Sequence, residues 1–218
     1  MTDQVSLDPA KLFASVASRP GAVIAAVLGN LIPVYGVVKL GWDPGEILIL
    51  YWLENVILGL FALSKIRASR RGEKATAGLL ALFVLHYGIF CAAHLVFVLV
   101  LADSLAQQHG GSGGGLDGAL SQAGFGWAVL GLLVINGLSQ WWDWWVPERW
   151  LTADPGREMV APYGRIVVLH LTLLIGTGLM VMFNAPAGTI LILCLMKAVL
   201  EIVTIALRDV VLATPRPG

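Results

Sequence analysis

Acidic and imidazole side chains stand inside long apolar stretches of this sequence. Glu54, His86 and His170 fall in three different stretches, each surrounded by aliphatic and aromatic neighbours. Ionisable groups at membrane depth are costly and are usually paired or functional. Carboxylate and imidazole suit zinc or iron, and three protein ligands leave one position open for water. The three residues are therefore candidate metal ligands.

Two further residues add chemistry to this candidate site. Glu201 would serve as a general base or an additional ligand, and Arg165 would hold an anionic group. A bound divalent ion lowers the pKa of its water towards neutrality, and surrounding lipid would supply an apolar substrate. The pattern favours a metal-dependent hydrolase or transferase that acts inside the membrane on a small or lipid-like substrate.

Other interpretations use the same side chains. In a proton-coupled transporter or channel for a small solute, the Glu and His residues would relay charge without metal. In a structural membrane protein, a hydrogen-bonded core would hold the helices together, with Lys197 and Glu201 paired at i,i+4. A haem between two histidines is a less favoured option. The other polar residues predicted to be buried are Asn30, Asn55, His94, Asn136 and Lys197.

His94 is predicted to lie apart from the candidate metal site. Counted from the inner end of each apolar segment at ~1.5 Å per residue, His170 lies ~8 Å deep and His94 ~25 Å deep. His94 also lies about 12 Å above His86 on the same helix. A metal ion with bonds of ~2 Å cannot reach both of these rings across an undistorted helix.

Six apolar segments must position these residues, and each is long enough to cross a bilayer core of ~30 Å. Of the 14 Lys and Arg residues, all but Lys39 and Lys197 fall in the N-terminal segment, in alternate connections or in the C-terminal tail. Positive residues stay on the cytoplasmic side. The sequence predicts an all-α, polytopic membrane helix bundle with six transmembrane helices and cytoplasmic N- and C-termini. The predicted spans are 21–40, 46–64, 77–102, 125–145, 166–184 and 189–207.

The composition leaves no room for a soluble domain. Hydrophobic residues make up 57% of the chain and charged residues 13%, about half of the ~25% usual in soluble domains. We expect one membrane domain over residues 20–210, a cytoplasmic or interfacial segment over 1–19 and a cytoplasmic tail over 211–218. The connection 103–124, which contains the Gly-rich stretch 109–115, is predicted to be a mobile outer loop.

The composition also limits the classes of partner that we expect for this protein. A net charge of zero argues against nucleic acid as a partner. The lipid bilayer of the inner (plasma) membrane is the expected surrounding, and a homo-oligomer is compatible with the sequence. Cys91 and Cys194 both fall inside predicted spans, which argues against a disulfide framework.

Three strings resemble a prokaryotic membrane family known as domain of unknown function 6498. They are YWLENVILG at 51–59, HYGIFCAAH at 86–94 and PYGRIVVLH at 162–170. The resemblance runs from roughly residue 20 to 210. It implies a polytopic membrane protein and no particular activity, and it draws attention to the same Glu and His residues.

Overall fold

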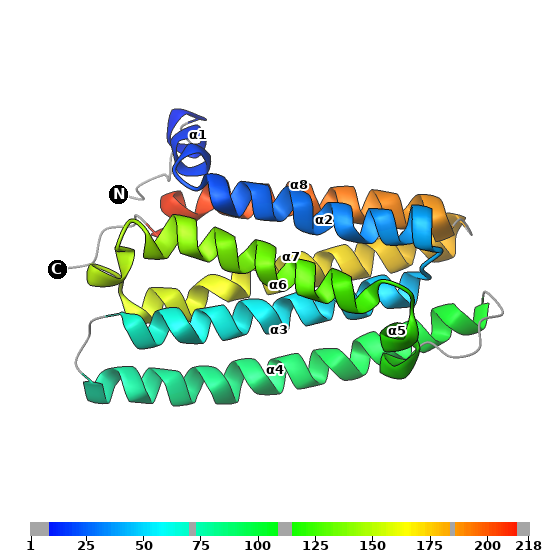
Figure 1. The fold of residues 1–218 in the computed structure, drawn as a ribbon, viewed down its shortest axis with the longest axis horizontal. Helices are drawn as coiled ribbons and strands as arrows, with labels where there is room; N and C mark the ends of the chain where they lie inside the picture. The colour runs from blue at the N-terminus through cyan, green and yellow to red at the C-terminus, as the bar shows by residue number, and fades with distance from the viewer. Residues whose placement is uncertain (1–8, 70–72, 109–114, 184–185, 213–218) are drawn as a thin grey trace, which may run out of the picture.

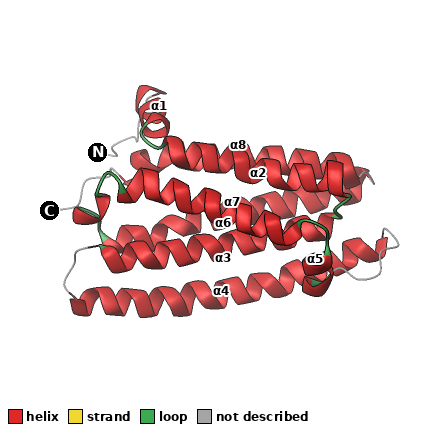
Figure 2. Ribbon diagram, in the orientation of Figure 1, coloured by secondary structure: helices red, strands yellow, loops and turns green. Residues whose placement is uncertain are grey.

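The computed structural model describes residues 9–69, 73–108, 115–183 and 186–212, and every regular element in these ranges is a helix (Figures 1 and 2). The prediction of an all-α fold is confirmed for this part of the chain. The prediction of a loop over 103–124 is wrong in part, because residues 103–108 and 116–121 are helical, while residues 109–114 lie outside the described residues. The α-helices are α1 Pro9–Ala17, α2 Pro20–Leu40, α3 Pro44–Ala68, α4 Glu73–Gln108, α5 Leu116–Ser121, α6 Phe125–Gln140, α7 Pro155–Phe183 and α8 Pro186–Leu212. A π-helical turn, η1 Trp141–Trp145, continues α6, and a 3-10 turn, η2 Arg149–Leu151, follows it.

Proline and glycine mark the helix boundaries. The first residue of α1, α2, α3, α7 and α8 is proline, whose missing N–H and fixed φ suit the first helical turn. Gly41 ends α2 with φ 70°, a left-handed conformation that favours glycine. The start of α3 is capped by Glu46, whose carboxylate accepts a hydrogen bond from the Asp43 N–H at 2.8 Å.

The long helices run alternately up and down, side by side (Figure 1). α3 packs against α4, α6 and α7, while α2 packs against α6 and α8, and α1 lies against α8. The start of α2 and the end of α8 lie at the same end of the bundle, together with η1 (Figure 1). We call this the terminal end of the bundle.

Asp143 ties η1 to the first turn of α2. Its carboxylate accepts hydrogen bonds from the backbone N–H groups of Gly21 at 3.1 Å and Ala22 at 2.6 Å. These N–H groups have no partner within their own helix, so the carboxylate satisfies donors that would otherwise be orphaned. The π-helical turn is thereby attached to α2 at the terminal end of the bundle.

Each predicted span falls on one of the long helices, and most of these helices begin before the predicted span. The predicted span 125–145 consists of α6 together with η1. Within the described residues, three helices are long and apolar enough to cross a membrane: Pro20–Leu40, Pro44–Ala68 and Thr76–Leu105. The six-span topology and the cytoplasmic termini remain predictions.

Candidate functional site

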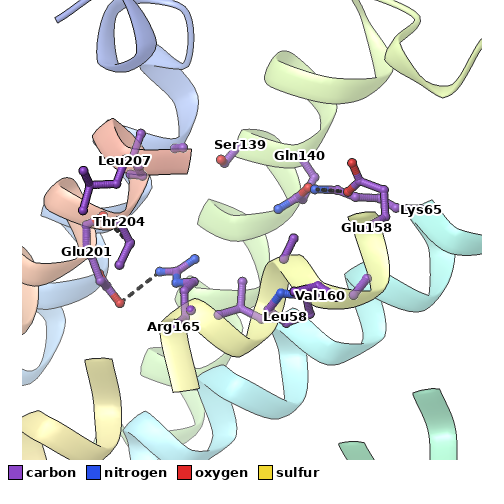
Figure 3. Close-up of a pocket in the computed structure, with 16 residues that line it drawn as sticks. Leu58, Lys65, Ser139, Gln140, Glu158, Val160, Arg165, Glu201, Thr204 and Leu207 are labelled. Atoms are coloured by element: carbon purple, nitrogen blue, oxygen red, sulfur yellow. Dashed lines mark hydrogen bonds and ion pairs between the residues drawn. The ribbon is translucent and has the colours of Figure 1, made fainter. Parts of the chain in front are cut away.

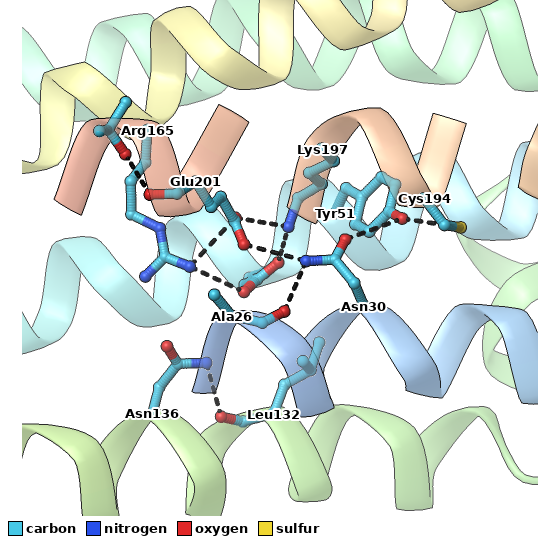
Figure 4. Close-up of polar contacts among 11 residues, drawn as sticks. Ala26, Asn30, Tyr51, Leu132, Asn136, Arg165, Cys194, Lys197 and Glu201 are labelled. Carbon is cyan, nitrogen blue, oxygen red and sulfur yellow. Dashed lines mark hydrogen bonds and ion pairs between the residues drawn. The ribbon is translucent and has the colours of Figure 1, made fainter. Parts of the chain in front are cut away.

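Four charged side chains from three helices meet inside the bundle (Figure 4). Lys197 of α8 lies between two carboxylates, with its Nζ 2.9 Å from Glu54 Oε2 and 2.6 Å from Glu201 Oε1. Arg165 of α7 joins the same two residues, with Nη2 3.4 Å from Glu54 Oε1 and 3.1 Å from Glu201 Oε1. We call Glu54, Arg165, Lys197 and Glu201 the charge cluster.

The charge cluster contains two carboxylates and two cationic side chains. The side chains of Glu54, Lys197 and Glu201 are at most 4% exposed, whereas that of Arg165 is 25% exposed. Carboxylates buried this deeply are tolerated only when opposite charges and hydrogen bonds compensate their lost hydration. The cluster is therefore electrically neutral when all four groups are ionised, and Arg165 is the member that reaches towards open space.

Polar groups of α2 and α3 complete the cluster. Asn30 donates from Nδ2 to Glu201 Oε2 at 3.0 Å and to the Ala26 carbonyl at 2.7 Å. The Tyr51 hydroxyl lies 3.4 Å from Asn30 Oδ1 and 3.0 Å from Cys194 Sγ. Lys197 Nζ also stands 4.5 Å above the Tyr51 ring, within reach of a cation–π interaction. Four helices, α2, α3, α7 and α8, thus contribute to one polar network.

A cavity of about 400 Å³ adjoins the charge cluster (Figure 3). Arg165 and Glu201 form part of its wall, and a second ion pair, Lys65 with Glu158 at 3.9 Å, forms another part. The cavity lies towards the terminal end of the bundle, because its lining includes the early part of α2 and the late part of α8. The remaining lining residues are Ala22, Leu58, Ala62, Ser139, Gln140, Val160, Ala161, Pro162, Gly164, Thr204, Ile205 and Leu207. The cavity is therefore mainly apolar, with charged groups at defined points.

The structure separates the three predicted metal ligands. Glu54 is paired with cations in the charge cluster. His86 is exposed, and its Nδ1 lies 2.6 Å from the Tyr163 hydroxyl. His170 Nε2 lies 3.1 Å from His94 Nδ1. Within the described residues, no three His, Cys, Asp or Glu side chains come together in a way that could hold a metal ion.

The predicted difference in depth between His94 and His170 is therefore wrong. The two rings are neighbours, although counting along the spans placed them far apart. That count started at the predicted inner ends, residues 77 and 166, whereas α4 begins at Glu73 and α7 at Pro155. Because the predicted ends do not lie at a common level, depths measured from them cannot be compared between helices.

The remaining predicted residues have local roles. Asn136 is buried and donates from Nδ2 to the Leu132 carbonyl of its own helix at 2.9 Å. The backbone carbonyl of Asn55 accepts a hydrogen bond from the Tyr87 hydroxyl at 2.9 Å, which joins α3 to α4. The predicted pairing of Lys197 with Glu201 is confirmed. The Lys65–Glu158 pair has no signal in the sequence, because its members lie 93 residues apart in chain order and no spacing rule links them.

Comparison with known proteins gives one family. A family of unknown function (DUF6498) matches residues 13–215, a range that includes the charge cluster and all the long helices. No curated protein and no solved structure matches the chain.

Proposed function

The chain belongs to this family of unknown function, DUF6498, and we propose that it is a polytopic membrane protein that binds a small amphipathic anion beside Arg165 and carries it together with a proton. The observation that carries this proposal is that Arg165 belongs both to the charge cluster and to the wall of the cavity. Its guanidinium joins both buried carboxylates of the charge cluster and also lines the cavity.

Six membrane-crossing segments would be α2, α3, α4, α6 with η1, α7 and α8. Their alternating directions support this topology (Figure 1), as do the three helices that meet the length and apolarity needed to cross a membrane. The alternate basic connections place both termini in the cytoplasm by the positive-inside rule. The cavity would then face the cytoplasmic half of the inner (plasma) membrane.

An anionic group that enters the cavity would compete for Arg165. The planar guanidinium presents several N–H donors and binds carboxylate or phosphate in a fork geometry. The apolar lining, formed by residues such as Leu58, Val160 and Leu207, would contact an attached hydrocarbon chain. Glu201 can release Arg165 without losing all compensation, because Lys197 and Asn30 still bind its carboxylate.

Charge balance links anion binding to a proton. The cluster is neutral with four ionised groups, so a bound anion adds one uncompensated negative charge in an environment of low dielectric constant. Such a charge is expensive to bury. Uptake of one proton by Glu54 or Glu201 would restore neutrality, and its release on the other side of the membrane would accompany the release of the anion.

The metal-dependent hydrolase or transferase favoured by the sequence needs Glu54, His86 and His170 around one ion. The structure gives it no support, because Glu54 is held by two cations and the histidines have other partners. The structural interpretation explains the ion pairs but gives no role to the adjoining cavity.

Binding is tested with amphiphiles of equal chain length that differ only in the head group. We expect an alkyl phosphate or alkyl carboxylate to raise the melting temperature of the purified protein in neutral detergent, and an alkyl alcohol to have no such effect. Arg165→Gln should abolish the shift. Arg157→Gln is the matched control, because Arg157 is exposed on the same helix and does not line the cavity. Equal shifts for anionic and uncharged amphiphiles would refute the anion site.

Proton coupling is tested in weakly buffered solution with a pH indicator. Wild-type protein should take up about one proton for each anion bound. Glu201→Gln leaves the cluster with one excess positive charge, so this variant should bind the anion without proton uptake. The same uptake in both proteins would show that the proton does not come to the cluster.

A further inference from the structure

A pair of histidines lies outside the charge cluster and is not used in the proposed function. His94 of α4 is 4% exposed, and its Nδ1 lies 3.1 Å from His170 Nε2 of α7. Phe90 lies beside both rings, at centroid distances of 6.2 Å from His94 and 5.2 Å from His170. Phe97 also lies beside His94, at a centroid distance of 6.3 Å. The two imidazoles therefore meet in an aromatic environment.

Hydrogen bonding fixes the tautomer of one ring. His170 Nδ1 lies 2.9 Å from the Ile166 carbonyl, which can only accept, so the hydrogen of the neutral ring is on Nδ1. The Nε2 of His170 then carries a lone pair that points at His94. This arrangement, in which one ring nitrogen donates to a carbonyl and leaves the other free to bind, is the usual support of a metal-ligating histidine.

Without an ion, the hydrogen of the His94 ring stands on Nδ1 and is donated to the lone pair of His170 Nε2. His94 Nε2 is buried and has no hydrogen-bond partner among the described residues. A cation bound between the rings would take the place of the shared hydrogen, and the His94 hydrogen would then stand on Nε2. Both facing nitrogens would then present lone pairs to the cation.

We propose that His94 and His170 bind a transition-metal ion of the zinc class between Nδ1 and Nε2. One ion can bind both nitrogens, which lie 3.1 Å apart, through metal–nitrogen bonds of ~2.0–2.1 Å. The nitrogen–metal–nitrogen angle is then about 100°, close to the angle between ligands of a tetrahedral ion. Imidazole is a good ligand for zinc, copper, iron and nickel. Water or a small ligand from outside the chain would fill the remaining positions. This proposal is independent of the anion site, because the two sites share no residue.

The chain has only four histidines, so metal binding by the His94–His170 pair can be measured without the other two. The double variant His86→Gln/His109→Gln retains only the proposed pair and is purified with a tag that contains no histidine. We expect it to bind one Zn²⁺ per chain, as the wild type does. Adding His94→Gln or His170→Gln should weaken binding by at least about tenfold, since even the loss of an outer hydrogen-bond partner commonly has an effect of this size.

A second measurement does not depend on variants that alter the pair. X-ray absorption of zinc bound to His86→Gln/His109→Gln should show two imidazole ligands, which can only be His94 and His170. Absence of stoichiometric Zn²⁺ from the wild type after titration, a spectrum without imidazole, or unchanged affinity after loss of His94 would each overturn the proposal. In that event the pair is a hydrogen bond between helices and nothing more.

Discussion

Lys197 shows how one residue can hold several helices together. Its ammonium contacts Glu201 on its own helix, Glu54 on α3 and the face of the Tyr51 ring. The ammonium group has three hydrogens, so two carboxylates can be bound at once. Because Arg165 contacts the same carboxylates, removal of one charge disturbs the balance of the whole cluster.

This coupling predicts non-additive effects of substitutions. Glu201→Ala and Lys197→Ala should each destabilise the protein by about 3–5 kcal/mol, because each leaves an uncompensated buried charge. The double variant should lose less than the sum, since Glu54 and Arg165 remain as a neutral pair. Unfolding by SDS titration in mixed micelles measures all three. Lys39→Ala, at an exposed position, is the control and should change stability by less than ~0.5 kcal/mol. Additive losses would mean that the two residues act separately.

At the scale of elements, α3 is the helix that positions the site. It packs against α4, α6 and α7, and it carries both Glu54 and Tyr51. Its contact with α4 includes Gly59, where a Cβ atom would overlap the ring of Tyr87. The Tyr87 hydroxyl in turn donates to the Asn55 carbonyl of α3. A small residue at this point therefore lets the two helices approach closely.

Gly59→Ala should accordingly destabilise the protein by about 1–3 kcal/mol through overpacking between α3 and α4. Gly88→Ala is the matched control on the facing helix, because a Cβ there would meet no atom within 4 Å. In a helix interior, alanine is favoured over glycine by ~0.8–1.0 kcal/mol, so this variant should be neutral or more stable. Melting temperatures in detergent distinguish the two. Equal stability of both variants would argue against close contact at Gly59.

At the scale of the whole molecule, the direction of each helix determines at which end of the bundle its connections lie. The end of α3 and the start of α4 lie at the terminal end of the bundle, and the far end of α4 lies at the opposite end (Figure 1). With 36 residues, α4 is ~54 Å long at 1.5 Å per residue, more than a bilayer core requires.

Reporter fusions test the resulting topology. A fusion after Arg71 should be active only as a cytoplasmic reporter, and one within 111–115 only as an external reporter. The positive-inside rule gives the expected direction, because the connection from Lys65 to Lys74 is strongly basic. Fusions after residue 212 should report the cytoplasm as well. Identical signals from the first two positions would contradict the six-span proposal.

The sequence by itself determined the long helices and one ion pair within a helix. Apolar segments separated by Pro, Gly and basic residues predicted the helical stretches, because hydropathy and backbone breakers act locally along the chain. Lys197 and Glu201 could be paired from spacing alone, since residues four apart face the same side of a helix. The same reasoning selected Glu54 and Asn30 as buried polar residues and Arg165 as a residue that could hold an anionic group, but it did not select their partners.

Only the tertiary structure decided which of these residues meet. Glu54 pairs with Lys197 across 143 positions of chain, and His170 meets His94 instead of Glu54. The cavity beside Arg165 also has walls from several helices, so no single segment predicts it. Periodicity fixes the face of a residue and its height along its own helix. It leaves open how far neighbouring helices slide and rotate against each other, because that depends on packing across the whole bundle.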